Sequence, residues 1–371
     1  MKIEGQFTDF VLKMRVWAKE LGFSDLRIAD IRLDGEEKRL QQWLSQGFHG
    51  EMHYMAAHGM KRCRPDELLP GTVRVISVRM DYLPDTEALP REKSDLRRAD
   101  PLAARISLYA RGRDYHKVLR ARLQKLADKM HDAIGPFSYR VFTDSAPVME
   151  VAFAGKAGMG WQGKNNLLLC RDGGSFFFLG EMLVDLPLPV DSVEGAHCGT
   201  CMRCIQACPT GALVASHHLD ARRCVSYLTI EFKGSIPLDL RPLIGNRIYG
   251  CDDCQLCCPW NRFAKVSGVS DFAVRHDFDR VTLLELFDWT ETEFLQRTQG
   301  SPIRRIGYAC WCRNIAVALG NALRVVTDAA EAARIVAALH GKRRTVSDMV
   351  DEHIDWALEQ KYRKQQPHIA G

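Results

Sequence analysis

Along the first half of the chain, segments with the hydrophobic spacing of a helix alternate with segments that have the spacing of a strand. Residues 7–21 place apolar side chains on one helical stripe, which ends at Gly22. Residues 72–80 (TVRVISVRM) are rich in β-branched residues and predict a buried strand. From Asp114 to about Ala133 the apolar residues again recur at helical spacing, and Asp114 is placed to cap that helix.

Three more strand-like runs follow before the pattern changes. Residues 139–143 predict a strand that delivers Asp144 at its end, and residues 167–170 and 175–184 predict two further strands. Because helices and strands alternate, residues 1–190 are predicted to form an α/β (α+β) domain.

The second half of the chain has a different character. Prolines and a glycine between 187 and 195 mark a boundary, and most of the cysteines follow within residues 191–265. Only helical patterns come after them, notably at 303–323 and 328–339. We therefore expect a cysteine-rich domain at 191–265 and a small all-α region at 266–371.

Composition agrees with a soluble globular protein. The chain has 371 residues, of which 46% are hydrophobic and 26% are charged, and its net charge of +5 is only a weak preference for polyanions. The first residues lack the apolar run of a signal peptide, and the most apolar stretch, residues 176–190, is interrupted by Glu181 and Asp185. The 13 cysteines thus predict metal ligands in a reducing compartment, and we expect a cytoplasmic protein without membrane contact.

The first cysteine run has the spacing of an iron–sulfur protein. It reads Cys198-x2-Cys201-x2-Cys204-x3-Cys208-Pro209. In ferredoxins with two [4Fe–4S] clusters, three such thiolates hold one cluster and the cysteine before the proline reaches to the other. Thiolates this close together suit iron–sulfur clusters or zinc, whereas hard metal ions prefer oxygen ligands.

A second cysteine–proline pair begins at Cys258. Cys254 and Cys251 precede it at the ferredoxin spacing, but Ile248 stands where the outermost ligand would be. Cys224, between the two runs, is the natural replacement. The resulting assignment gives the first cluster Cys198, Cys201, Cys204 and Cys258, and the second cluster Cys208, Cys224, Cys251 and Cys254.

Alternatives to this assignment remain at the level of sequence. Two zinc sites would also use four cysteines each, but they give the proline-marked cysteine no role. Cys257 continues the spacing from Cys254, yet it breaks the register with the proline, so we predict that it binds no metal. The other cysteines are predicted to be small buried side chains: Cys63, Cys170, Cys310 and Cys312.

Several further blocks accompany this cysteine layout. They include YARGRDYH at 109–116, TDSAPVMEVAFA at 143–154, GWQGKN at 160–165, ARRCVSYLTIE at 221–231 and GNRIYGCDDCQLCCPWN at 245–261. Together they resemble the epoxyqueuosine reductase family, a relative of the corrinoid-dependent reductive dehalogenases, over nearly the whole chain. The resemblance implies a cobalamin, resting as cob(II)alamin, in the first domain, two [4Fe–4S] clusters in a ferredoxin-like domain, and a HEAT-like helical C-terminal region. The implied reaction is reduction of epoxyqueuosine to queuosine at the wobble position of tRNA.

Asp144 matches the proton donor that the resemblance implies. Reductive loss of an epoxide oxygen needs two electrons and a proton for the departing oxygen, which the protein must supply. A carboxyl group that donates near neutral pH needs a pKa raised by burial, and apolar residues 146–149 follow Asp144 closely. Without the family, Thr-Asp-Ser is more simply explained as a turn or a helix cap.

The loop from Gly158 to Lys164 imitates a phosphate-binding loop. Asn165 stands where such a loop needs Ser or Thr, and the loop follows a helix-like segment and precedes a strand-like one, so a nucleotide triphosphatase is excluded. The resemblance places this loop against the cobalamin, whereas an ordinary turn is the alternative. The expected contacts to the corrinoid are Arg64, Asp144, Gly163, Lys164, Asn165, Ser226, Tyr227 and Gln255.

The resemblance also implies the partners. These are a tRNA, bound through an anticodon stem-loop whose modified base leaves its stack, and an external electron donor; we expect a monomer. Candidate phosphate contacts are Arg111, Arg113, Arg222, Arg223, Arg304, Arg305 and Arg313. Two alternative functions are a reductive dehalogenase of small organohalides and a ferredoxin-like electron carrier, which would need neither Asp144 nor the matching blocks.

Overall fold

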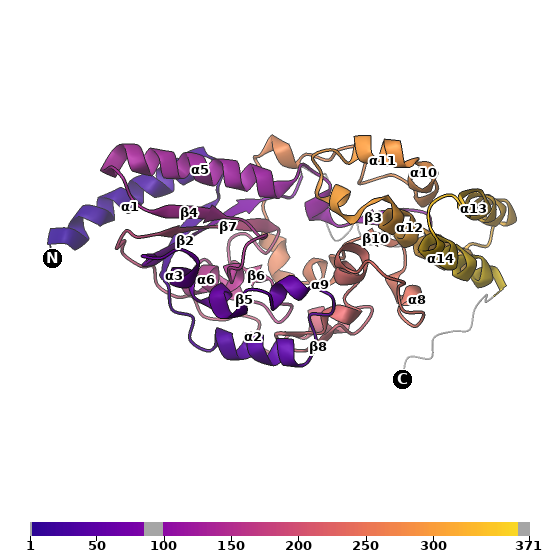
Figure 1. Cartoon of the computed structure of the whole chain (residues 1–371), viewed down its shortest axis with the longest axis horizontal. Helices are drawn as coiled ribbons and strands as arrows, with labels where there is room; N and C mark the ends of the chain where they lie inside the picture. The colour runs from indigo at the N-terminus through magenta and orange to yellow at the C-terminus, as the bar shows by residue number, and fades with distance from the viewer. Residues whose placement is uncertain (1, 85–98, 363–371) are drawn as a thin grey trace.

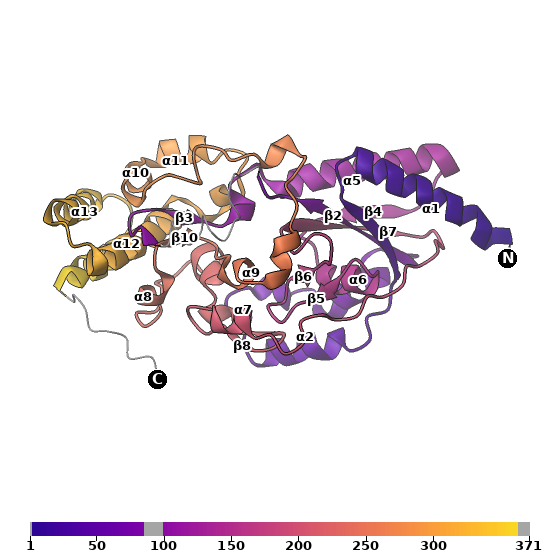
Figure 2. The same ribbon diagram turned by 180° about the vertical axis from the view of Figure 1, so that it is seen from behind.

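The computed structural model describes residues 2–84 and 99–362. The molecule is elongated, with a β-sheet toward one end and a group of helices at the other (Figures 1 and 2). The cysteine-rich segment lies between these two ends, on the lower side in Figure 1. Of the helices in the described ranges, none is long and apolar enough to cross a membrane.

Four of the described strands form the main sheet. They are β1 (Asp25–Asp30), β2 (Arg74–Asp81), β7 (Phe177–Val184) and β4 (Tyr139–Phe142), in the order β1-β2-β7-β4. Each neighbouring pair is antiparallel. The predicted mixture of helices and strands is therefore confirmed, but the fold is of the α+β type, since a doubly wound α/β domain would have parallel strands.

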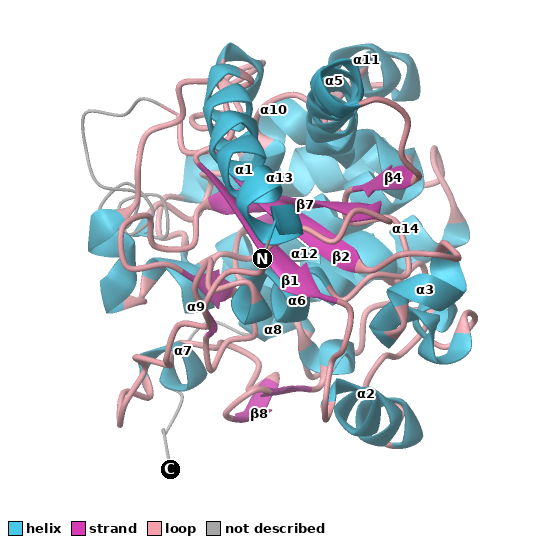
Figure 3. Cartoon of the chain, turned by 90° about the vertical axis from the view of Figure 1, so that its left-hand side faces the viewer, coloured by secondary structure: helices cyan, strands magenta, loops and turns pink. Residues whose placement is uncertain are grey.

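Helices cover both faces of this sheet (Figure 3). On one face lie α1 (Lys2–Glu20) and α5 (Tyr115–Ile134), and on the other lies α6 (Glu150–Lys156). Successive side chains of a strand point to opposite faces, so Ile76 of β2 joins the core under α1 and α5, whereas Val75 packs with Phe153 of α6. The cap predicted for α5 is confirmed, because the Asp114 carboxylate accepts the backbone N–H of His116 at 3.1 Å.

The cysteine-rich segment is built from short elements. They are α7 (Arg203–Gln206), β8 (Leu213–Ala215), β9 (His218–Leu219), a π-helical turn (Tyr227–Glu231), α8 (Arg241–Ile244), β10 (Arg247–Tyr249) and α9 (Asp253–Leu256). The elements outside the main sheet that lie earlier in the chain are α2 (Glu36–Ser45), α3 (Pro65–Leu68), β3 (Arg105–Ile106), β5 (Trp161–Gln162) and β6 (Leu168–Leu169). Strands β5 and β6 pair as a hairpin, and β3 pairs with β10.

The helices after the cysteines share a core with residues on both sides of the expected domain boundaries. These helices are α10 (Leu283–Asp288), α11 (Glu291–Arg297), α12 (Tyr308–Val325), α13 (Ala329–Lys342) and α14 (Asp348–Glu359). One hydrophobic core joins residues from 102–110, 221–249 and 278–357, so it crosses the boundaries expected at 190 and 265. The C-terminal helices therefore hold the second half of the cysteine segment in place.

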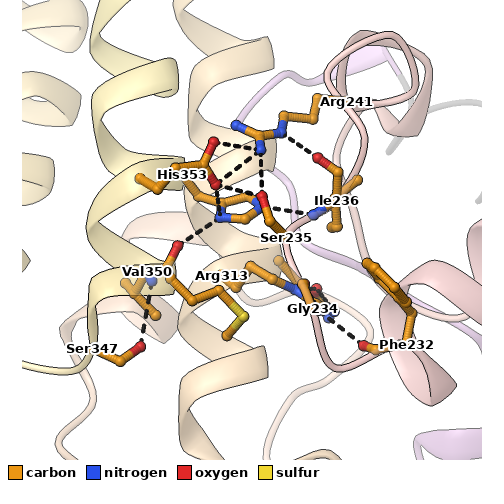
Figure 4. A network of polar contacts seen from close by, with 12 residues as sticks. Phe232, Gly234, Ser235, Ile236, Arg241, Arg313, Ser347, Val350 and His353 are labelled. Atoms are coloured by element: carbon orange, nitrogen blue, oxygen red, sulfur yellow. Dashed lines mark hydrogen bonds and ion pairs between the residues drawn. The ribbon is translucent and has the colours of Figure 1, made fainter.

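A buried polar network fastens α12 and α14 to that segment (Figure 4). Arg313 of α12 is 0% exposed and donates to the backbone carbonyl oxygens of Phe232 and Gly234 at 2.9 and 2.8 Å. The expectation that Arg313 contacts tRNA is therefore wrong, because its charge is used inside the protein. On α14, the imidazole Nε2 of His353 accepts the backbone N–H of Ile236 at 3.1 Å, and its Nδ1 lies 2.7 Å from the carbonyl oxygen of Met349.

We expect this network to make stability depend on pH through His353. Burial lowers the pKa of His353 to about 4, and its Nε2 must stay unprotonated to accept from Ile236. The unfolded chain binds a proton below about pH 6.5, whereas the folded chain does so only near pH 4, so stability is lost as pH falls through this window, by as much as ~3 kcal/mol. Denaturant unfolding of the protein and of a His353→Gln variant should diverge at pH 7 and converge toward pH 4.5. A difference that stays constant with pH would contradict this role.

Candidate active site

The eight cysteines assigned to clusters line two cavities, four in each. The smaller cavity has a volume of about 270 Å³ and is lined by the four cysteines of the first assigned set, Cys198, Cys201, Cys204 and Cys258. The larger has a volume of about 450 Å³, and one of its walls carries the second set, Cys208, Cys224, Cys251 and Cys254. The chain thus brings Cys224 to the place where the second ferredoxin run lacks a ligand.

Cys257 lines neither cavity. Its Sγ lies 3.6 Å from the backbone carbonyl oxygen of Cys254. Burial raises the pKa of Cys251 in the larger cavity to about 12, so a metal that binds there has to displace a proton. Within the described part of the chain, no three His, Cys, Asp or Glu side chains lie close enough together to hold a single metal ion.

Charged side chains fix the turn that carries Cys251 and Cys254. Asp252 accepts the backbone N–H of Leu108 at 2.8 Å, and Asp253 accepts from Arg105 at 2.7 Å. Gly250, with a φ of +70°, allows the close approach, because a Cβ there would lie 2.6 Å from the Cβ of Ser107. The predicted burial of the remaining cysteines (Cys63, Cys170, Cys310 and Cys312) is confirmed.

The rest of the larger cavity is mainly apolar and aromatic. Its broad aromatic wall consists of Tyr82, Tyr109, Tyr115, Phe177 and Phe178. A few polar side chains interrupt this wall, among them Asn165, Ser226 and Gln255. Apolar walls with a few placed polar groups, at this volume, are typical of sites for organic cofactors. The cavity therefore suits a large flat cofactor that lies between the second cysteine set and the sheet.

The structure brings half of the expected corrinoid contacts to this cavity. Asp144, Asn165, Ser226 and Gln255 line it. The amide nitrogen of Asn165 donates to the carbonyl oxygen of Cys254 at 3.0 Å, so Asn165 also ties the β5–β6 hairpin to the cysteine turn.

The other four expected contacts lie elsewhere. Arg64 is on the surface, in ion pairs with Glu37 and Glu67. The hydroxyl of Tyr227 accepts the backbone N–H of Glu51 at 2.8 Å. Lys164 lines the smaller cavity, where its Nζ donates to the carbonyl oxygen of Gly199 at 2.7 Å. Gly163 lines neither of the two cavities. Its turn is packed so closely that a Cβ atom at position 163 would lie 2.6 Å from Asn165 Oδ1.

Asp144 lies at the apex of a tight turn directly after β4. Its φ of +55° is rare for a residue with a side chain, and the backbone N–H of Ser145 donates across it to the carbonyl oxygen of Thr143 at 2.6 Å. The backbone N–H of Asp144 itself donates to the carboxylate of Glu150 at 2.5 Å. The turn leaves the Asp144 side chain 56% exposed toward the cavity.

Two residues from the first turn of α5 hold the Asp144 carboxylate. The Tyr115 hydroxyl donates to it, and His116 Nε2 lies 3.2 Å from the same oxygen. The other imidazole nitrogen, Nδ1, lies 2.8 Å from Asp114. His116 therefore sits between two carboxylates.

This arrangement corrects the expected charge state of Asp144. The Asp144 carboxylate faces the cavity and not bulk water, and this loss of solvation acts to raise its pKa. The hydrogen bonds from His116 and Tyr115 outweigh that effect and leave the pKa below its usual value. Burial also opposes charge on His116, yet the carboxylates of Asp114 and Asp144 raise its pKa to about 9. Near neutral pH the proton of this group therefore resides on the imidazole.

Sequence reasoning missed Tyr115 and His116 as site residues. Both lie in the YARGRDYH block, which is part of the family resemblance. However, no pattern in the local sequence indicates that the start of α5 lies against the end of β4. It also missed Glu150 and Glu181, which lie behind Asp144.

Of the expected tRNA contacts, Arg305 lies nearest to this group. Its guanidinium is half exposed and pairs with Glu231 at 2.5 Å, and its positive charge contributes to the low pKa of Asp144. Arg113 and Arg222 are exposed at other places and pair with Asp271 and Asp220. Like Arg313, the remaining expected contacts donate to backbone carbonyl oxygens; these are Arg111, Arg223 and Arg304.

Two family models match the chain. Residues 62–145 match "Epoxyqueuosine reductase QueG, DUF1730", and residues 197–261 match "4Fe-4S double cluster binding domain". An epoxyqueuosine reductase of Alicycliphilus denitrificans is 56% identical over 358 residues, which cover 95% of this chain and 98% of that protein. One of Burkholderia pseudomallei is 55% identical, with 96% and 93% covered.

Solved structures have the same fold. A Bacillus subtilis epoxyqueuosine reductase, with its catalytic aspartate loop swung out of the active site, superposes with a TM-score of 0.84 at 25% identity, covering 98% of this chain and 96% of that one. An epoxyqueuosine reductase with an epoxyqueuosine-modified tRNA-Tyr stem loop superposes with a TM-score of 0.80 at 24% identity, covering 96% and 100%.

Proposed function

Because the chain belongs to the epoxyqueuosine reductase family, we propose that it reduces epoxyqueuosine to queuosine at the wobble position of tRNA. The observation that carries this proposal is the larger cavity, which has cysteines on one wall and the Asp144–His116 pair on another. Electrons and protons can therefore reach the same cavity from two of its walls.

Two [4Fe–4S] clusters and a cobalamin are the proposed cofactors. The two cysteine sets would hold the clusters, and the larger cavity would hold the corrinoid against Asn165, Ser226 and Gln255. When bound, the corrinoid supplies a cobalt centre, cob(II)alamin at rest, through which electrons from the clusters reach the substrate carbon. The aromatic wall excludes water from that space, which strengthens the electrostatic interactions inside it.

Residues around Asp144 would supply the proton for the reaction. His116 holds a proton at Nε2, 3.2 Å from Asp144, and the Tyr115 hydroxyl fixes the same carboxylate. As the epoxide oxygen gains negative charge, Asp144 is the group exposed to the cavity that can pass this proton to it. Asp114 keeps the imidazole oriented from the other side.

The tRNA would approach from the side of Arg305. Its half-exposed guanidinium lies near Asp144 and can contact the phosphates of an anticodon stem-loop whose modified base enters the cavity. The helices from residue 266 onward, which we propose form a HEAT-like unit, would widen this contact. We further propose a cytoplasmic monomer that takes its electrons from an external donor protein.

The direct test is conversion of epoxyqueuosine-containing tRNA by anaerobically purified protein. We expect one oxygen atom to be lost from the modified nucleoside in the presence of a strong one-electron reductant, as measured by mass spectrometry of digested tRNA. We also expect corrinoid absorption together with cluster signals in paramagnetic resonance. The affinity of the protein for tRNA should fall steeply as the salt concentration rises. Cleavage of carbon–halogen bonds without action on the tRNA would favour a dehalogenase, and clusters without corrinoid would favour an electron carrier.

A further inference from the structure

Two glutamates lie behind the turn that carries Asp144. Glu150 begins α6 and lines the larger cavity. Glu181 lies in the middle of β7 and is 0% exposed. The strand register places it between Ser77 of β2 and Phe142 of β4, on the sheet face that α6 covers. A carboxyl group in the centre of a sheet is unusual, and the reaction described so far gives it no role.

The surroundings of Glu181 require it to share a proton. Among the residues that the structure describes, no donor is hydrogen-bonded to either of its carboxylate oxygens, and the polar group that reaches it is the carboxyl of Glu150. Two carboxyl groups can hydrogen-bond to each other only when one of them carries a proton. An unpaired carboxylate in apolar surroundings is costly, so the pair keeps a proton instead of two charges.

The charged groups on the neighbouring elements do not neutralise the pair. The cationic side chains on these elements contact other groups and not the two glutamates. Three of them form ion pairs with aspartates: Arg27 with Asp25, Arg79 with Asp172, and Lys156 with Asp30. Arg62 donates to the backbone carbonyl oxygens of Tyr54 and Ala146. Arg140 of β4 stacks on the ring of Phe142, and Asp144 and His116 face the pair from the cavity side. Burial, with the charge of Asp144 beside it, raises the pKa of Glu150 to about 7. Burial, with the charge of Glu150 beside it, raises the pKa of Glu181 well above its usual value.

We propose that Glu150 and Glu181 share one proton and deliver it through Glu150 to the cavity, where it serves as the second proton of the reduction. The delivery rests on the proposed function, whereas the shared proton does not. Removal of an epoxide oxygen as water breaks two C–O bonds, forms a C=C bond, and consumes two electrons from the clusters and two protons. The Asp144–His116 pair holds one of these protons. Glu150, whose carboxylate accepts the backbone N–H of Asp144, holds the other at the same wall.

The shape of the pH profile tests the delivery. The proton enters the cavity on Glu150, whose pKa is about 7, so the contribution of this route to kcat is present at low pH and falls as pH rises through that value. We expect Glu181→Gln to lower kcat roughly 10-fold near pH 6 and to match the unaltered enzyme near pH 8.5. Glu150→Gln, which keeps an acceptor for the Asp144 N–H, should do the same. Ser77→Ala, at the position opposite Glu181, is the control and should leave the profile unchanged.

Infrared spectroscopy of the protein without substrate tests the shared proton separately. A carbonyl band of a protonated carboxyl should persist at pH 8, where Glu150 alone would be ionised, because the pKa of Glu181 lies well above its usual value. This band should disappear at pH 8 in Glu181→Gln. Loss of kcat by the same factor at every pH, or no loss, would overturn the delivery. Absence of the band at pH 8 in the unaltered protein would overturn the shared proton, even where a variant fails to fold. Failure of the unaltered protein to convert the tRNA, with the band present, would instead refute the proposed function.

Discussion

The Cys224→Ala variant is expected to contain about four irons per chain, whereas the unaltered protein contains about eight. Cys224 lines the larger cavity with Cys208, Cys251 and Cys254, and a cube that has lost one of four thiolates is exposed to solvent and oxygen at that corner. The first cluster should survive, because its four cysteines line a different cavity. Iron and acid-labile sulfide analysis of anaerobic protein measures this directly.

Cys257→Ala is the matched control for this experiment. Cys257 has the same intermediate exposure as Cys224 and follows the α9 turn, but it lines neither cavity. We expect its removal to leave all the iron in place. Full iron content in Cys224→Ala, or loss of iron in Cys257→Ala, would show that the second ferredoxin run uses a different register.

The sequence was informative wherever the chemistry is local in the chain. Cysteine spacing separated eight candidate ligands from five other cysteines, and the cavities group those eight into the same two sets. Helix caps are equally local, and Asp328 accepts the backbone N–H of Ala330 at 2.7 Å at the start of α13. The direction of strand pairing is not local. Periodicity reports which face of a strand is buried, but it says nothing about which neighbour a strand meets or in which direction.

The edge strand β1 and the buried Arg313 are two features that the local sequence does not predict. β1 has the sequence DLRIAD, whose three charged residues reduced its strand signal although it pairs with β2 along its whole length. Arg313 looked like a surface charge because a sequence displays the charge and not the carbonyl groups that meet it. The carbonyl oxygens that Arg313 satisfies belong to residues about 80 positions earlier in the chain.

The same limit applies to the candidate catalytic group. The position of Asp144 after a strand could be predicted, but its pKa depends on Tyr115 and His116, which belong to another element. The sequence therefore indicated a carboxyl group that lines the cavity, but it predicted the wrong direction for the shift of its pKa. A proton held jointly by an imidazole and a carboxylate is a better description of the donor than a carboxyl group isolated by burial.

Replacing Asp144 with asparagine is expected to lower kcat by at least ~10³-fold and to leave corrinoid, clusters and tRNA affinity unchanged. The amide has nearly the same shape, and asparagine tolerates the positive φ of this turn as well as aspartate does, so the backbone need not move. What the variant loses is the group that carries the proton from His116 into the cavity. Ser145→Ala, in the same turn, is the control and should retain activity.

The pH dependence identifies the partner of Asp144. The proton on His116 is present below about pH 9 and is lost above it, so kcat of the unaltered enzyme should fall as pH rises through that value. His116→Gln should lose this limb of the profile and retain only the rate that Asp144 alone supports, because glutamine can donate a hydrogen bond but cannot hold a transferable proton. If Asp144→Asn converted the tRNA at the normal rate, the carboxylate would serve only to orient the imidazole, and His116 itself would be the proton donor.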